Sequence, residues 1–121
     1  MKETKLGLAE HLLFGEAPVA LITTFQLRDD APLEQFVRLW TEVANLMERR
    51  HGFVSSRLYR AAIGGQAAEY IMVAHWTSAR LLATAQADPE IRSVERPLHS
   101  LLVGVRRVLC EPATETIVAR D

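Results

Sequence analysis

The sequence lacks the features that define several large classes of protein. It has a single cysteine, Cys110, so no disulfide can form within the chain, and a cysteine-based zinc site would lack ligands. The longest apolar runs, such as Ala17–Ile22 and Leu101–Val105, fall far short of the roughly 20 residues that span a bilayer. The first five residues are not followed by the apolar core of a signal peptide. A cytoplasmic location is therefore expected.

An excess of charge of one sign is also missing. Lys and Arg total 14 and Asp and Glu total 15, which gives a formal net charge of −1. A near-neutral chain has no overall field to attract nucleic acid, so neither nucleic acid nor a membrane is expected as a partner. What is present, 121 residues of which 49% are hydrophobic, suits one globular domain and excludes a disordered chain. We expect an N-terminal arm over residues 1–16 and a single domain over residues 17–121.

Hydrophobic periodicity predicts four strands and a long first helix. β-branched, aliphatic and aromatic residues favour strands over Pro18–Leu27, Phe53–Ala61, Glu69–Trp76 and about Leu102–Glu111. An apolar stripe at helical spacing predicts a helix from about Ala31 to His51. Pro32 would lie in its first turn, and Gly52 would end it in a left-handed conformation.

The second half of the chain carries further capping and turn signals. Thr77 or Ser78 would cap a second helix, Ala79–Ala87, and Asp88-Pro89 would start a further short turn of helix. A loop is expected after Pro97. Two more features are predicted outside these elements, a hairpin turn at Gly64-Gly65 and a small extra strand at Thr116–Val118.

The resulting order, β-α-β-β-α-β, is the ferredoxin-like α+β pattern, with a four-stranded antiparallel sheet that has helices on one face only. The third strand tests what happens on the other face. Even-numbered residues from Tyr70 to Trp76 share one face of that strand, and Ile71, Val73 and His75 share the opposite face. Both rows are mainly apolar, so both faces should be buried. We expect two chains to pack sheet against sheet as a homodimeric α/β barrel.

Three segments carry a family resemblance. The stretches His51–Tyr59, Tyr70–Ser78 and Ala87–Pro89 resemble the antibiotic biosynthesis monooxygenases, with Gly-Phe opening the second strand, a tryptophan ending the third and an Asp-Pro break. The likeness covers roughly residues 18–110 and extends to the small cofactor-independent monooxygenase of actinorhodin biosynthesis. It implies the dimeric α/β-barrel fold and oxidation of an aromatic, polyketide-like phenol or anthrone to a quinone by O2, without flavin, haem or metal.

The resemblance also implies site residues. Trp76 matches the third-strand tryptophan, which would pack on or hydrogen-bond the substrate, and Arg96 matches an arginine that would hold a phenolate or developing superoxide. The alternatives are a core-edge aromatic for Trp76 and a surface salt bridge for Arg96. Two positions depart from the pattern. Met72 replaces an asparagine and Leu82 replaces a tyrosine, so two of the four polar groups of the pocket are missing, although both residues would still contact the substrate.

Other candidates come from the residues themselves. Tyr70 and Tyr59 offer hydroxyl groups to the pocket, with strand packing as the alternative for each. Arg57 shares a predicted face with Phe53 and Tyr59 and would point at the pocket or form an ion pair at its rim. Trp40 and Phe36 lie on the helix stripe, which in this fold also walls the pocket, with core packing as the alternative for Trp40. His99 is the histidine best placed for a general base.

The histidines give no metal or haem site by their spacing. His11, His51, His75 and His99 are scattered along the chain, and haem-degrading proteins of this fold have a tryptophan and a histidine where this chain has Ala85 and Glu95. No cofactor is therefore expected. Three hypotheses stay open: a cofactor-independent oxygenase, a polyketide cyclase or isomerase in the same pocket, and a non-catalytic dimer that binds a small aromatic ligand.

Overall fold

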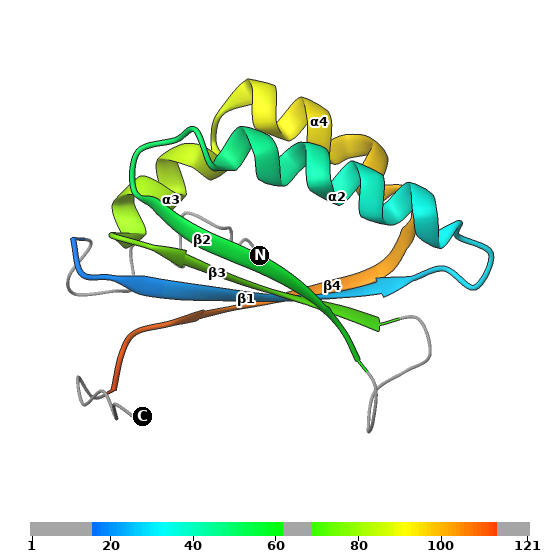
Figure 1. Ribbon diagram of the computed structural model, residues 1–121, viewed down its shortest axis with the longest axis horizontal. Coiled ribbons are helices and arrows are strands. Elements are labelled where there is room, and N and C mark those ends of the chain that lie inside the picture. Colours follow the sequence, from blue (N-terminus) through cyan, green and yellow to red (C-terminus); the bar gives the residue numbers. More distant parts are fainter. Residues whose placement is uncertain (1–15, 62–68, 114–121) are drawn as a thin grey trace, which may run out of the picture.

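The computed structural model describes residues 16–61 and 69–113. Within these residues four strands and three helices follow one another in the order β-α-β-β-α-α-β (Figure 1). The elements in chain order are β1 Val19–Leu27, α2 Leu33–Met47, β2 Phe53–Arg60, β3 Glu69–Trp76, α3 Ala79–Gln86, α4 Pro89–His99 and β4 Leu102–Cys110. The predicted arm (apart from Glu16), the Gly64-Gly65 turn and the Thr116–Val118 strand lie outside the described residues.

The four strands form one antiparallel sheet in the order β2-β3-β1-β4. Alternate residues of β1 are buried, from Val19 to Leu27, because the odd-numbered side chains face the helices. Leu21 lies opposite Ala74 of β3 and Leu109 of β4. The ferredoxin-like α+β fold expected from the sequence is confirmed.

All three helices cover the same face of the sheet (Figure 1). Two groups of buried side chains join the layers. One centres on Trp76, Leu82 and Ile91 under α3 and the start of α4, and the other centres on Phe36 and Leu98 under α2 and the end of α4. Among residues 16–61 and 69–113 no helix lies on the opposite face of the sheet, which is called the uncovered face below.

The first helix is shorter than the sequence indicates. It spans Leu33–Met47, with Pro32 as its N-cap rather than in its first turn. After Met47 the amides of Arg49 and Arg50 bond to carbonyls three residues back, which tightens the chain into turns instead of a continuing helix. Gly52 then adopts the predicted left-handed conformation, with φ of 94°.

The α4 segment corrects a second expectation. Instead of one short turn followed by a loop, residues Pro89–His99 form an 11-residue helix that contains Pro97. Asp88 caps it, since its Oδ1 accepts a hydrogen bond of 2.8 Å from the Glu90 amide. Pro97 lies in the last turn and cannot donate the helical hydrogen bond to the carbonyl four residues back, so the burial of Ile91 and Leu98 holds that helix to the core in spite of it. His99 therefore ends a helix and does not lie in a loop.

No helix among the described residues is long and apolar enough to cross a membrane.

Candidate functional site

A cavity lies between the helix-covered face of the sheet and the three helices. The space inside it that water-sized molecules can enter is about 60 Å³. Its lining is mainly apolar and comes from every strand and every helix: Leu21, Phe25, Trp40, Val43, Ala44, Met47, Phe53, Met72, Ala74, Trp76, Leu82 and Leu98 form the apolar part, and Thr23, Ser56, Gln86, Glu95, His99 and Arg107 form the polar part. An apolar cavity with a few convergent polar groups is the usual form of a small-molecule site.

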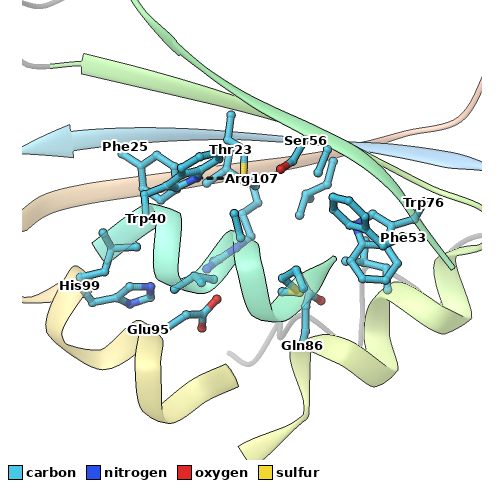
Figure 2. Close-up of a pocket in the computed structure, with 18 residues that line it drawn as sticks. Thr23, Phe25, Trp40, Phe53, Ser56, Trp76, Gln86, Glu95, His99 and Arg107 are labelled. Atoms are coloured by element: carbon cyan, nitrogen blue, oxygen red, sulfur yellow. Dashed lines mark hydrogen bonds between the residues drawn. The ribbon is translucent and has the colours of Figure 1, made fainter. Parts of the chain in front are cut away.

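One end of the cavity is aromatic. Trp76, which ends β3 and is only 2% exposed, packs edge-to-face on Phe53 with ring centroids 5.5 Å apart and an interplanar angle of 88°. These two residues face each other across β3 and β2 because the strands pair them directly. Figure 2 shows both rings together at the end of the cavity away from His99.

The indole of Trp40 spans the space between α2 and the sheet. Its Nε1 donates a hydrogen bond of 3.3 Å to the Sδ atom of Met72 (Figure 2). Thioether sulfur is a weak acceptor, so this contact holds the indole loosely. Met72, which stands where the pattern of the resemblance has an asparagine, thus already accepts a hydrogen bond from Trp40.

Four of the six polar lining groups lie toward the other end, where Figure 2 also places the rings of Phe25 and Trp40. Figure 2 shows Glu95 and His99 of α4 on the helix side, and Thr23 and Arg107 of β1 and β4 on the sheet side. Thr23 is 2% exposed, and its buried Oγ1 atom has no hydrogen-bond partner among the described residues. A buried hydroxyl without a partner is uncommon, because it loses its bonds to water and gains none.

Arg107 is a cation in a mainly apolar wall. Its Cα lies opposite that of Thr23 in the β1–β4 register, so its side chain leaves the sheet on the helix-covered face with Val105 and Leu109. It is half-buried and lines the cavity with Glu95. Within residues 16–61 and 69–113, no carboxylate lies within ion-pair distance of its guanidinium.

The structure brings half of the predicted site residues together. Trp76, Trp40, Met72, Leu82 and His99 all line the cavity. Tyr70 and Phe36 are buried beside it but not in its lining, and their rings pack on each other at 5.2 Å.

Arg57 and Tyr59 require a correction, because they leave β2 on the face away from the cavity. The register of β2 against β3 shifts between Phe53 and Ser55. This β-bulge adds one residue, so Phe53 keeps its inward direction while Arg57 and Tyr59 point outward, where Tyr59 is 47% exposed. Ser56 turns inward in their place.

Arg96 also lies outside the cavity lining. It is an exposed residue of α4, one position after Glu95, which does face the cavity. Because the segment is a helix rather than a turn followed by a loop, adjacent residues point in directions about 100° apart. The arginine that the structure supplies to the cavity is Arg107.

Sequence reasoning missed five residues of the polar lining: Thr23, Ser56, Gln86, Glu95 and Arg107. For Arg107 a signal was available, because a charged residue sits in phase with Val105 and Leu109 on a strand. The inward direction of Ser56 depends on the bulge, which strict alternation does not show. Among the described residues no group of three or more His, Cys, Asp or Glu side chains is arranged to hold a metal ion.

No protein-family model matches the sequence, and no curated protein matches it. Solved structures do match its fold. The cofactor-independent oxygenase SnoaB from Streptomyces nogalater is 22% identical, with 84% of this chain and 97% of that chain covered and a TM-score of 0.72. Rv0793 from Mycobacterium tuberculosis is 24% identical, with 84% and 100% covered and a TM-score of 0.70. A protein from Caulobacter crescentus, provisionally named an antibiotic biosynthesis monooxygenase, is 10% identical, with 84% and 95% covered and a TM-score of 0.72.

The chain has the fold of the antibiotic biosynthesis monooxygenases. The resemblance drawn from the Gly-Phe, tryptophan and Asp-Pro segments is therefore confirmed at the level of fold. At these identities the monooxygenase fold alone is shared, and a fold hosts several chemistries. The activity must be argued from the cavity itself.

Proposed function

We propose that the protein is a cytoplasmic, cofactor-independent oxygenase of secondary metabolism that oxidises an aromatic, polyketide-like phenol or anthrone to a quinone with O2. The observation that carries the proposal is the cavity between the sheet and the helices, whose mainly apolar lining includes four aromatic rings and a few polar groups. An electron-rich phenolate can pass an electron to O2 itself. The protein then has to bind the flat ring, favour its anion and keep water away.

The net reaction balances without another reactant. The methylene carbon of an anthrone loses two hydrogens, one atom of O2 becomes the carbonyl oxygen, and the other leaves as water. Trp76 and Trp40 would pack against the ring, and His99 at the polar end would accept the proton that leaves the substrate.

The cavity must widen to accept such a substrate. About 60 Å³ is smaller than the roughly 150 Å³ of an apolar cavity that holds benzene. The weak Trp40–Met72 contact joins α2 to the sheet across this space, so movement of the indole is the simplest way to enlarge it.

An oxygen-uptake assay with an anthrone or a dihydroxynaphthalene tests the proposal. We expect consumption above the uncatalysed rate in air-saturated buffer without added cofactor. The variant Ala44→Phe would fill the cavity and lose this activity, whereas Asn45→Phe, which alters the neighbouring exposed position of α2, would keep it. If wild-type protein adds nothing to the uncatalysed rate, the oxygenase proposal fails.

A cyclase or isomerase is the second candidate, favoured by the carboxylate of Glu95 and the imidazole of His99 in the same cavity wall. Such a pair suits proton transfer at a polyketide carbon. Conversion of a polyketide under anaerobic conditions would support this candidate over the oxygenase. Ligand-induced thermal stabilisation without turnover of any kind would instead indicate a binding protein.

We also propose that two chains form a two-fold dimer, sheet against sheet. The uncovered face carries half-buried Ala20, Ile22, Ile71 and Val73 and exposed Val108. A contiguous apolar sheet face is typical of an interface. Sedimentation velocity at micromolar concentration should give the mass of two chains, and a monomer would contradict the proposal.

A further inference from the structure

The inward face of the sheet carries a polar pair that the resemblance to known monooxygenases does not predict. Thr23 and Arg107 are Cα partners in the β1–β4 register, and both line the cavity. Directly opposed residues of an antiparallel pair have Cβ atoms about 4.5–5.5 Å apart. The two side chains therefore leave the sheet side by side, with the guanidinium at the end of the longer one.

Both groups lack a partner within the described part of the chain. The Thr23 Oγ1 atom is buried and unbonded, and no carboxylate lies within 4.0 Å of the Arg107 guanidinium. Thr23 is flanked on its other side by Met72, whose sulfur already accepts the Trp40 N–H. The layer of the sheet at Thr23 thus contains the donors of Arg107 and Thr23, and its side-chain acceptors are neutral: the Thr23 hydroxyl itself and the weak Met72 sulfur, which is occupied.

We propose that Thr23 and Arg107 form an oxyanion subsite that binds an ionised oxygen, phenolate or carboxylate, on an aromatic ligand. A guanidinium has only donors, and a hydroxyl can donate one hydrogen, so together they select an acceptor that carries negative charge. The aromatic end formed by Trp76 and Phe53 receives the ring. This inference deepens the proposed function and rests on it for the aromatic nature of the ligand.

The chain supplies its own probe for the test. Its only two tryptophans, Trp40 and Trp76, both line the cavity, so quenching of their fluorescence reports a ligand that enters. Three single-ring ligands separate the chemistry: 4-nitrophenol at a pH where it is ionised, 4-nitrobenzoate, and the neutral ether 4-nitroanisole. The first two carry a negatively charged oxygen, as a phenolate and as a carboxylate, and the ether carries no charge.

We expect wild-type protein to bind at least one of the two anions more tightly than nitroanisole. The variants Arg107→Met and Thr23→Val should each weaken the anion by about tenfold or more, since a hydrogen bond to a charged group is lost, and leave nitroanisole unchanged. Arg106→Met and Thr24→Val are matched controls, because these neighbours leave the same strands on the opposite face, and both should bind the anion as wild type does. Thermal melts of all five proteins check that each one folds.

Equal binding of anion and ether by wild-type protein would overturn the subsite, as would an Arg107→Met variant that keeps its affinity for the anion. A preference for nitrobenzoate over nitrophenolate, or the reverse, assigns the source of the charge. The oxygen-uptake assay fails independently of this test. Selective anion binding without oxygen uptake would support the oxyanion subsite and contradict the oxygenase proposal. Full oxygen uptake by both Arg107→Met and Thr23→Val would support the oxygenase proposal and contradict the subsite.

Discussion

Replacing Thr23 by Val is expected to make the empty protein more stable. The Thr23 side chain is 2% exposed and its Oγ1 atom has no hydrogen-bond partner among the described residues. Valine has almost the same shape, so the substitution exchanges an unsatisfied hydroxyl for a methyl group without changing the size of the side chain. Leaving such a group buried and unbonded costs about 1–3 kcal/mol.

The change should be visible as a shift in melting temperature. A protein of 121 residues has an unfolding entropy of roughly 2.1 cal/mol/K per residue, so each kcal/mol corresponds to about 4 °C. A gain at the lower end of the range would raise Tm by about 4–8 °C. Circular dichroism melts and urea titrations, at one fixed protein concentration, measure this directly because dimerisation would make Tm concentration-dependent.

Two variants control the interpretation. Thr24→Val makes the same chemical change on the uncovered face, where the residue is only half-buried, and should shift Tm much less. Thr23→Ala removes the hydroxyl together with a methyl group and should be less stable than Thr23→Val, since it enlarges the cavity. A Thr23→Val variant no more stable than wild type, with an unchanged urea m-value, would refute the idea that the hydroxyl is held at a cost.

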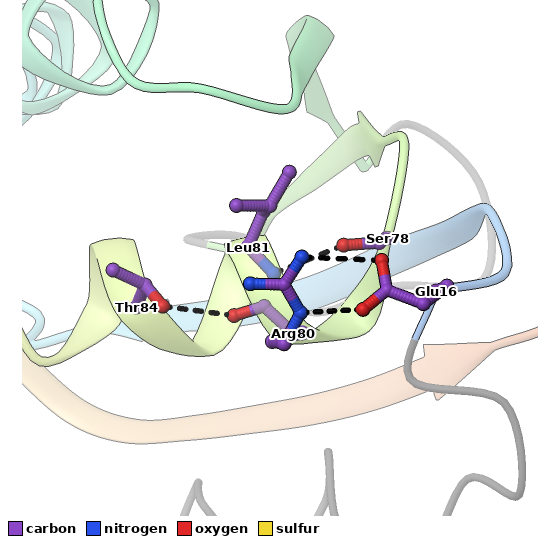
Figure 3. Close-up of polar contacts among 5 residues, drawn as sticks. All are labelled: Glu16, Ser78, Arg80, Leu81 and Thr84. Atoms are coloured by element: carbon purple, nitrogen blue, oxygen red, sulfur yellow. Dashed lines mark hydrogen bonds and ion pairs between the residues drawn. The ribbon is translucent and has the colours of Figure 1, made fainter.

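Three further outcomes are expected. Gly52→Ala should destabilise the fold by about 1–2 kcal/mol in urea titrations, because φ is positive there and the new Cβ would meet the side chain of Leu81 at 2.7 Å. Arg80 donates two hydrogen bonds, of 2.5 and 3.2 Å, to the carboxylate of Glu16, and this ion pair lowers the pKa of Glu16 (Figure 3). The stability that the ion pair contributes is therefore present at neutral pH and is lost as the pH falls through the lowered pKa of the folded state. The Tm difference between wild type and Glu16→Gln should shrink toward pH 3. Val73→Lys, on the uncovered sheet face, should convert the proposed dimer to monomer in sedimentation velocity, whereas an unchanged mass would contradict sheet-to-sheet association.

The fold was predictable because its signals are local and repeat. Strand β3 runs over the predicted residues, since its alternating apolar rows are bounded by turn signals on both sides. The caps Ser78 and Asp88 were also correct, because short polar side chains before a helix bond to its first free amides. The errors lie where tertiary packing overrides a local rule. A loop was expected after Pro97, but α4 continues past it to His99 because Leu98 is buried in the core.

The site was less predictable, because a residue lines the cavity only if its side chain leaves its strand or helix toward the cavity, whatever its type. Trp76 lines the cavity because it ends a strand whose alternation is unbroken, and its contact with a substrate stays a prediction. Arg96 was predicted from its distance along the chain from Trp76, which the resemblance supplied. In the structure this position lies on the exposed side of α4, so the side chain of Arg96 points away from the cavity. Arg107 comes from the fourth strand, and its position beside Thr23 follows from a pairing between segments more than 80 residues apart.

The bulge in β2 determines which side chains of that strand lie on each face of the sheet. With strict alternation from Phe53, the cavity would have received Arg57 and Tyr59, a second cation and a phenol. The extra residue sends both to the uncovered face and turns Ser56 and Leu58 inward instead. The cavity thereby keeps one arginine in its lining, so an anionic ligand has a single cationic position, beside Thr23, rather than two competing ones. The same shift gives the uncovered face a polar and aromatic border next to its apolar centre, which is the composition expected of a dimer interface with a wet rim.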